Sequence, residues 1–148
     1  MLAIDALAFL LLTIFTQFLK VIDTETGTMT DGFGANASDE IQGYIPCYIE
    51  NDYEAENSMC IKVKGNSMSP KIENKDIVQV VKQTSVDSGS IAVVLIDGEQ
   101  GFVKRVVYGK TWIELHSINP AYPVQRFENE DVLRVSVVGL VRKIIKDI

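Results

Sequence analysis

Two residues of the chain have side chains that together could cleave a peptide bond. Ser67 lies in the turn GNSM, just ahead of a run rich in β-branched residues, and Lys104 follows 37 positions later in GFVKRVVY. A serine hydroxyl is a weak nucleophile near neutral pH and needs a base. A lysine buried among apolar side chains loses its charge readily, so its neutral amine can accept the proton. Ser–Lys pairs are an attested variant of the serine–histidine arrangement.

Each of these residues also has an ordinary interpretation. A turn serine often does no more than satisfy its own backbone, and most lysines on strands extend to solvent. Strand alternation places Lys104 on one face with apolar neighbours, namely Phe102, Val106 and Tyr108. His116 is a competing base, but no acidic side chain is evident to orient it, so a surface histidine is the simpler interpretation. The residues alone leave the choice open.

Six short runs rich in β-branched residues follow residue 44, and turn signals separate them. They lie at 60–64, 76–81, 90–96, 101–108, 111–117 and 135–145. Asp97-Gly98 and Gly109-Lys110 are pairs typical of hairpin turns. No long helical pattern appears after residue 23. The sequence therefore predicts a compact, mainly β domain of about six or seven strands over residues 44–148.

The first 22 residues, MLAIDALAFLLLTIFTQFLKVI, differ from the rest of the chain. They are mostly apolar, and on a helix the polar ones form one narrow seam of Asp5, Thr13, Thr16, Gln17 and Lys20. The segment lacks the basic start and the small-residue cleavage site of a signal peptide. It is also slightly short and polar for a typical membrane span. We expect an apolar helix over residues 1–22 that contacts a membrane, a partner or a second subunit.

Residues 23–43 are expected to form a flexible acidic arm, because they are rich in Gly, Thr, Asp and Ser and lack periodicity. From residue 21 to residue 60 the chain has nine acidic residues and no lysine or arginine, within a net charge of −6. Such a segment repels phosphate. There is also no helix-turn-helix, zinc-finger spacing or basic stripe. We therefore expect no direct nucleic-acid binding by this chain.

The two cysteines, Cys47 and Cys60, are accompanied by a single histidine. These are too few soft ligands, wrongly spaced, for a structural zinc site. Two cysteines also do not make the disulfide framework of a small secreted domain. We expect ordinary reduced thiols in a cytoplasmic protein, with no metal and no cofactor.

An ordered set of motifs resembles the LexA/UmuD family of self-cleaving proteins, which includes SOS repressors and phage CI-type repressors. The set comprises GNSMSP (65–70), DIV (76–78), FVKRV (102–106), LHSINPAY (115–122) and VGLV (138–141). Each motif alone is a weak signal, but their order and the 37-residue separation of serine and lysine are specific. The resemblance covers about residues 44–148, with a weaker extension upstream.

This resemblance implies a serine peptidase that cleaves its own arm, with Ser67 as nucleophile and Lys104 as general base. The backbone amides of Asn66 and Ser67 would form the oxyanion hole. The nearest match to the family's cleaved bond is Phe33-Gly34. The resemblance also implies a homodimer formed through the C-terminal strands. In the family, a RecA filament on single-stranded DNA stimulates cleavage in an SOS or prophage response.

The chain departs from the family pattern in three places. Phe33 is bulky where relatives have Ala or Cys, and the turn at 73–76 is ENKD where relatives tend to have an Asp-Gly pair. The first 22 residues are also too few for the DNA-binding domain of a repressor. Two other interpretations therefore stay open. One is a type I signal peptidase-like membrane protease, although Ser67 follows Ile22 by 45 residues. The other is a catalytically degenerate dimerisation module.

Overall fold

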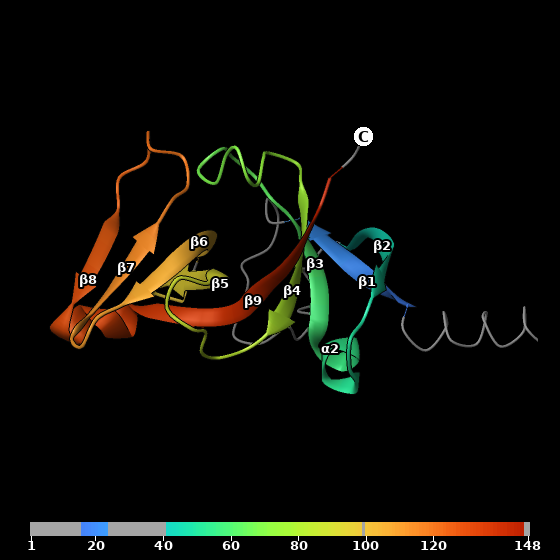
Figure 1. Cartoon of the computed structure of the whole chain (residues 1–148), viewed down its shortest axis with the longest axis horizontal. Coiled ribbons are helices and arrows are strands. Elements are labelled where there is room, and N and C mark those ends of the chain that lie inside the picture. The colour runs from blue at the N-terminus through green and yellow to red at the C-terminus, as the bar shows by residue number, and fades with distance from the viewer. Residues whose placement is uncertain (1–15, 24–40, 99, 147–148) are drawn as a thin grey trace, which may run out of the picture.

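The computed structural model describes residues 16–23, 41–98 and 100–146, and within these ranges nine strands form a single sheet (Figure 1). Their order is β2-β1-β3-β4-β9-β5-β6-β7-β8. The strands are β1 (Thr16–Asp23), β2 (Ile41–Tyr48), β3 (Ser58–Lys62), β4 (Ile77–Lys82), β5 (Ile91–Ile96), β6 (Gln100–Tyr108), β7 (Trp112–His116), β8 (Gln125–Glu128) and β9 (Val135–Ile145). Two short helices accompany them, α2 (Asp52–Asn57) and the 3-10 helix η1 (Asn129–Arg134). The predicted mainly β fold is confirmed.

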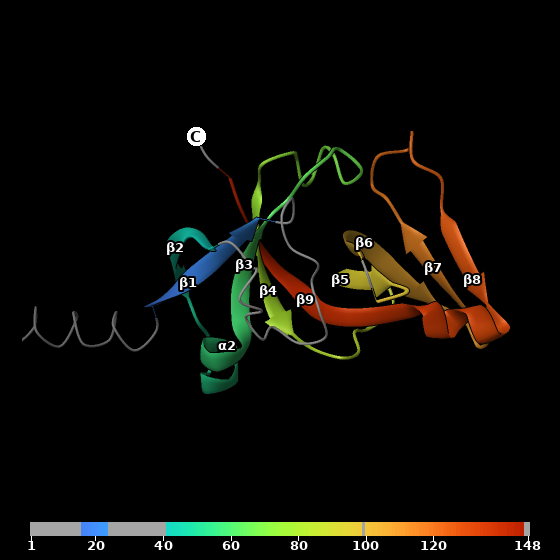
Figure 2. The same ribbon diagram turned by 180° about the vertical axis from the view of Figure 1, so that it is seen from behind.

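The long strand β9 joins two halves of the sheet. Its residues 139–145 pair with β4, and its residues 135–140 pair with β5. Strands β1 to β4 therefore lie on one side of β9 and strands β5 to β8 on the other, as both views of the ribbon show (Figures 1 and 2). The turn that carries Ser67 connects β3 to β4, whereas Lys104 lies on β6. The two candidate catalytic residues thus belong to different halves.

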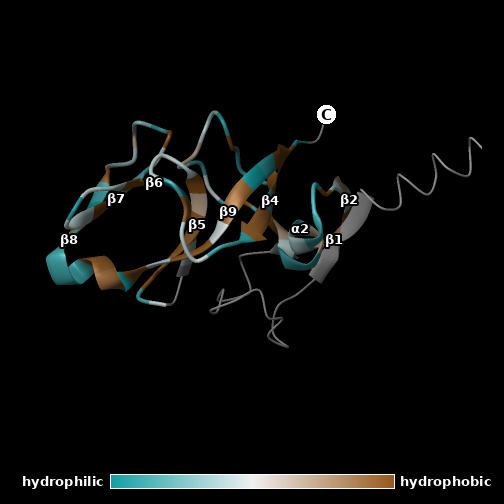
Figure 3. Cartoon of the chain, turned by 60° about the horizontal axis from the view of Figure 1, so that its bottom comes forward, coloured by the Kyte–Doolittle hydropathy of each residue, from teal (hydrophilic) through white to brown (hydrophobic). Residues whose placement is uncertain are grey.

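The central hydrophobic cluster packs side chains from both halves against each other. It comprises Ile61, Val63, Met68, Ile72, Val78, Val80, Val93, Leu95 and Val138. The hydropathy colouring shows the apolar residues of β4, β5 and β9 gathered in the middle of the molecule (Figure 3). Burial of apolar surface contributes about 25 cal/mol per Å². Because Met68 and Ile72 belong to this cluster, the serine turn is anchored to the core on its C-terminal side.

A second cluster fills the half made by β5 to β8, and it confirms the alternation predicted for β6. Val106 is fully buried in this cluster, and Phe102 and Tyr108 pack against it. Val103, on the other face of β6, packs against the central cluster instead. Both faces of β6 are therefore covered, and a side chain at position 104 must be buried or must reach a cavity.

The N-terminal end of the sheet differs from the prediction. Residues 16–23 form β1, which is antiparallel to β2 and parallel to β3. The expected helix over residues 1–22 is therefore wrong for residues 16–22, while residues 1–15 lie outside the described residues. Leu19 is 4% exposed and packs with Cys47, Ile49 and Cys60. A short apolar run with β-branched and aromatic residues can form either a buried strand or a helix. Here the backbone pairs with β2 on one side and β3 on the other, so the run forms a strand.

Two further boundaries shift from those expected. Strand β2 begins at Ile41, so residues 41–43, expected in the acidic arm, belong to the sheet. The rest of that arm, residues 24–40, lies outside the described residues. The short strand β8 was also not predicted, because QRFE has little of the β-branched character that marks the other strands. None of the helices in the described part of the chain is long and apolar enough to cross a membrane.

Candidate active site

The turn that carries Ser67 is fixed by hydrogen bonds at its base. The Val63 amide donates to the Asp76 carbonyl at 2.8 Å, which closes the loop between β3 and β4. Gly65 has a φ of +91°, a conformation that favours glycine, and its amide donates to Asn74 Oδ1 at 2.8 Å. The sequence Gly-Asn-Ser thus turns the chain sharply before Met68 enters the core. Ser67 is left partly exposed at the tip.

Lys104 is buried on β6, with 8% of its surface exposed. Burial lowers the pKa of its amine, because a desolvated ammonium is disfavoured relative to the neutral form. Its Nζ donates to Ser117 Oγ at 2.6 Å and lies 5.7 Å from the centre of the Tyr122 ring. The burial and the lowered pKa expected for this lysine are both confirmed.

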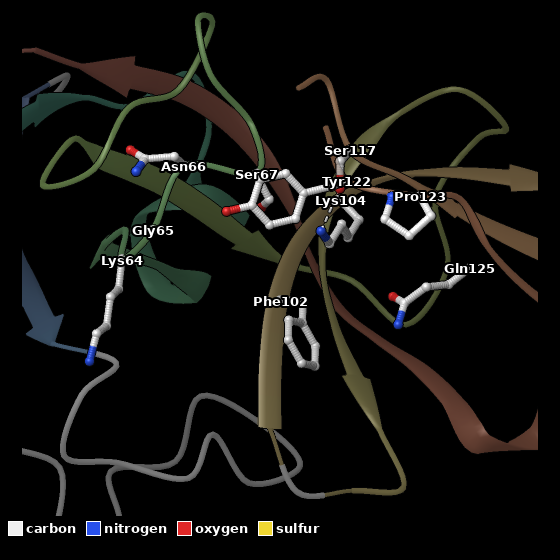
Figure 4. A pocket seen from close by; sticks show the side chains of 10 residues that line it. All are labelled: Lys64, Gly65, Asn66, Ser67, Phe102, Lys104, Ser117, Tyr122, Pro123 and Gln125. Atoms are coloured by element: carbon white, nitrogen blue, oxygen red, sulfur yellow. Dashed lines mark hydrogen bonds between the residues drawn. The ribbon is translucent and has the colours of Figure 1, made fainter. Parts of the chain in front are cut away.

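Ser67 and Lys104 face one cavity of about 320 Å³ (Figure 4). Its walls are formed by Lys64, Gly65, Asn66, Ser67, Phe102, Lys104, Ser117, Tyr122, Pro123 and Gln125. None of these lining residues is acidic, so within the described ranges no carboxylate on the wall stabilises the charged form of Lys104. No hydrogen bond between Ser67 and Lys104 is present among the described residues, and the Lys104 amine donates to Ser117. The fold therefore brings the candidate nucleophile and the candidate base to the same cavity without joining them directly.

The segment after β7 holds the serine turn from the other side of the cavity. The Asn119 amide donates to the Ser67 carbonyl at 3.0 Å, and Asn119 Nδ2 donates to the Asn66 carbonyl at 3.0 Å. The amides of Asn66 and Ser67 donate to no acceptor within the part of the chain that the structure describes. Both amides thus have the free donors that the predicted oxyanion hole requires.

A comparison with protein families identifies the fold that carries this site. The model of the Peptidase S24-like family matches residues 24–142. The chain belongs to the Peptidase S24-like family. Two LexA repressors are similar to the chain in sequence. The LexA repressor of Ruegeria sp. (strain TM1040) is 36% identical over 85 residues, 55% of this chain and 35% of the relative. The LexA repressor of Lacticaseibacillus casei (strain BL23) is 31% identical over 117 residues, 78% of this chain and 56% of the relative.

The chain therefore spans about a third to just over half of the length of these curated relatives. The match nevertheless includes the serine turn, β6 and most of β9, which are the parts of the S24-like domain that form and support the cavity.

Sequence reasoning missed Ser117, Asn119 and Tyr122 as members of the S24-like site. A signal for Ser117 was present in the hairpin between β6 and β7. Its register pairs Tyr108 with Ile113 and Arg105 with His116, so the next step places Lys104 opposite Ser117. Residues directly opposite each other on antiparallel strands share a face. The contacts of Asn119 and Tyr122 depend on how the segment after β7 folds back, which no local pattern indicates.

His116, the competing base, is not part of the S24-like site. It does not line the cavity, and it lies beside Arg105 in the β6–β7 pairing, on the face opposite to Lys104. The expectation that it lacks an acidic partner is wrong, because its Nε2 lies 2.9 Å from Glu114 Oε1. Hydrogen bonds from His116 and Arg126 lower the pKa of Glu114. His116 therefore does not compete with Lys104 as a candidate base for Ser67.

One stretch of β6 next to Lys104 is paired on one side only. Strand β6 pairs with β5 along residues 100–105, but its pairing with β7 begins at Arg105. Within the described ranges, residues 101–104 therefore have no strand on their second side. An unpaired strand edge is a surface to which an extended peptide can add through main-chain hydrogen bonds.

The two cysteines do not line this cavity, and they lie on β2 (Cys47) and β3 (Cys60). Both are free thiols, and their sulfur atoms are 4.0 Å apart. Burial, with a further contribution from Cys47, raises the pKa of the Cys60 thiol to about 12. The Cys60 thiol is therefore not ionised near neutral pH. Both cysteines belong to the hydrophobic cluster that packs this end of the sheet. The expected scissile pair, Phe33 and Gly34, lies outside the described residues.

Proposed function

We propose that this chain is a LexA-like regulatory peptidase domain in which Ser67 and Lys104 cleave the domain's own acidic arm. One observation carries the proposal. Lys104 is buried with a lowered pKa, has no acidic residue beside it on the cavity wall, and shares that cavity with Ser67. A buried, shifted and uncompensated ionisable group in a cavity is typical of a functional site. The S24-like family and its LexA relatives support the same conclusion.

In this mechanism, neutral Lys104 accepts the proton of Ser67 Oγ as that oxygen bonds to the carbonyl carbon of the scissile peptide. The amides of Asn66 and Ser67 stabilise the negative oxygen of the tetrahedral intermediate. Lys104 then donates the proton to the departing amine as the C–N bond breaks, which leaves an ester on Ser67. Lys104 next takes a proton from a water molecule as the water oxygen bonds to the ester carbon, and it gives that proton to Ser67 Oγ as the ester bond breaks. Acylation and deacylation each end with the lysine in its neutral form.

The bond that we propose for cleavage is Phe33-Gly34. Aromatic and apolar side chains of the cavity, namely Phe102, Tyr122 and Pro123, offer a wall that suits a bulky residue before the scissile bond. The open edge of β6 beside them suits an extended segment of chain. Phe33 is bulkier than the Ala or Cys of the family pattern, and the aromatic and apolar wall of this cavity suits a side chain of that size.

Comparison with LexA repressors favours a regulatory role over that of a signal peptidase. By analogy with the family, the domain is a cytoplasmic homodimer formed through its C-terminal strands. A RecA filament on single-stranded DNA stimulates its cleavage in an SOS or prophage response. Such a filament adds no catalytic group, since it only favours the arm conformation that enters the cavity.

The test is to incubate the full chain from neutral to alkaline pH and to follow intact mass. Two fragments that meet between Phe33 and Gly34 are expected, at a first-order rate independent of protein concentration. Ser67→Ala and Lys104→Ala should stay intact. A wild-type mass that remains unchanged after long incubation at high pH would contradict the proposal and support a binding-only module. A rate that rises with protein concentration would exclude cleavage of the chain's own arm.

The proposed bond has its own prediction. Phe33→Asp should slow cleavage strongly, because a carboxylate is poorly accepted by an apolar wall. Phe33→Leu should cleave at close to the wild-type rate, since it keeps an apolar side chain of similar bulk. Fragment masses from both variants identify the bond directly. Equal rates for Asp and Leu, or fragments that meet elsewhere, would show that Phe33 does not enter the cavity.

A further inference from the structure

The spacing of Ser67 and Lys104 is not set by strand pairing. The serine turn extends from β3 and β4, and Lys104 lies on β6, with β9 and β5 between these strands in the sheet. No hydrogen bond in the described residues joins the two side chains directly. A pair that reacts efficiently must nevertheless be held within about 0.5 Å of a productive geometry. Some other element must therefore connect the two halves at the cavity.

The segment 117–119, which follows β7, contacts both catalytic candidates. At one end, Ser117 Oγ accepts the hydrogen bond from Lys104 Nζ at 2.6 Å. At the other, Asn119 donates to the carbonyls of Asn66 and Ser67, both at 3.0 Å. Asn119 is itself held in place, because its Oδ1 accepts from the Ala121 amide at 3.0 Å. Three consecutive positions thus link the base to the turn of the nucleophile.

We propose that residues 117–119 are the positioning segment of the site, in which Ser117 orients the amine of Lys104 and Asn119 fixes the backbone of Ser67. The inference rests on the proposed function, because it assigns these residues to the Ser–Lys reaction. When an N–H of Lys104 is held by Ser117, the lone pair of the neutral amine is free to turn towards Ser67. Neither Ser117 nor Asn119 exchanges a proton with the substrate, so both are positioning residues.

The surroundings of Lys104 make the contribution of Ser117 measurable. The titratable groups on the cavity wall around Lys104 are the Lys64 ammonium and the Tyr122 phenol, and no carboxylate is among the lining residues. A hydroxyl oxygen that accepts from Nζ stabilises the ammonium more than the neutral amine, because a charge-assisted bond is stronger. Ser117 therefore partly offsets the effect of burial, and its loss must lower the pKa of Lys104 further.

The first measurement is an NMR titration of the Lys104 side chain in full-length Ser67→Ala protein, which cannot cleave itself. Adding Ser117→Ala should lower the pKa of Lys104, and Ser117→Thr should restore it, because threonine keeps the hydroxyl. Ser88→Ala is the matched control, since Ser88 Oγ accepts from the Tyr108 amide on the same strand at 3.1 Å but does not line the cavity that holds Lys104. An unchanged pKa in Ser117→Ala would overturn the role of Ser117.

The second measurement is the self-cleavage rate across pH. Ser117→Ala should lower the maximal rate about 10-fold and shift the pH profile to lower pH, as expected for a misplaced base. Asn119→Ser keeps a hydroxyl for the Ala121 amide but is too short to reach Asn66, so it should lower the rate without shifting the profile. Rates at the wild-type level in either variant would overturn the proposal for that residue. Urea midpoints of all variants separate these effects from a loss of folding.

These two measurements also distinguish the inference from the proposed function. If the wild-type chain never cleaves itself, the proposed function fails, and the titration still shows whether Ser117 holds Lys104. If the wild-type chain cleaves but the Ser117 and Asn119 variants behave like it, the proposed function stands and the positioning segment is wrong.

Discussion

Two buried ionisable side chains, one in each half of the sheet, have contrasting surroundings. Glu54, on α2, is 7% exposed, and its carboxylate accepts from the Glu50 amide and lies 3.2 Å from Arg142 Nε. Arg142 also pairs with Glu50, so one guanidinium serves both carboxylates. Lys104 is buried to the same degree, yet its amine lies beside the Ser117 hydroxyl and the Tyr122 ring.

The difference separates a structural charge from a reactive one. The Glu54 carboxylate has an amide and a guanidinium as partners and links α2 to β9 through Arg142. A buried ion pair that loses one partner leaves a desolvated charge. A buried amine without a counter-charge moves towards its neutral form, which is the form that accepts a proton. Burial alone therefore does not mark a functional group. Burial without electrostatic compensation, in a cavity that also holds a nucleophile, does.

Replacement of the uncompensated lysine gives the largest expected effect. Lys104→Met removes the base while keeping an unbranched apolar chain, so self-cleavage should fall by about 10³-fold or more. Time courses of intact mass at alkaline pH measure the loss. Lys110→Met, in the exposed turn between β6 and β7, is the matched control and should cleave at the wild-type rate. A Lys104→Met chain that still cleaves would remove the distinction between the two buried groups.

The pH dependence should follow the lowered pKa of Lys104. The cleavage rate should rise about tenfold per pH unit below that pKa and level off above it, because only the neutral amine accepts the proton. The free energy of unfolding should change with pH in the same direction as the cleavage rate. Between the folded-state pKa and the unfolded value of about 10.4, the unfolded chain binds more protons, so the free energy of unfolding rises with pH.

Urea unfolding of Ser67→Ala protein across this window measures the slope of stability against pH. Adding Lys104→Met should reduce that slope, since the methionine has no proton to gain on unfolding. A slope that persists unchanged would show that Lys104 titrates alike in the folded and unfolded states, contrary to the effect of its burial.

The compensated charge should show a moderate effect on stability and none on the reaction. Arg142→Met leaves Glu54 buried without its cation, at a cost of roughly 1–3 kcal/mol, with the lower end favoured because Arg142 is partly exposed. Adding Glu54→Gln should recover part of this loss, since the neutral amide needs no counter-charge. Urea midpoints measure both steps. A double variant less stable than the sum of the single changes would contradict a compensated pair.

Replacement of a third buried polar residue, Gln79, should have the smallest effect on stability and on cleavage. Gln79 on β4 is fully buried, and its Oε1 is the one buried side-chain oxygen or nitrogen without a hydrogen bond among the described residues. It lines no part of the cavity. Gln79→Met should therefore be neutral or stabilising, by up to about 1 kcal/mol, and should leave cleavage unchanged. A loss of cleavage would reveal a functional role for an unsatisfied group away from the cavity.

Local patterns in the sequence were enough to predict the parts of the site that lie on single elements. The alternation of apolar residues along GFVKRVVY placed Lys104 with Phe102 and Val106, and the structure packs these faces as predicted. The Gly-Asn-Ser turn was likewise recognisable from its residue types. Strand alternation and turn chemistry act over a few neighbouring residues, and they do not depend on what packs against them.

The tertiary structure decided what depends on residues distant in sequence. The composition of residues 16–23 is compatible with a helix or a strand. They form β1 because they pair with β2 and β3. Ser117 and Asn119 acquire their contacts only when the segment after β7 folds against both β6 and the serine turn. A hydrogen bond across 53 residues of chain depends on the packing of two halves of a sheet, and no local propensity encodes it. The sequence by itself thus determined which residues could react, and the packing of the two halves decided which residues hold them together.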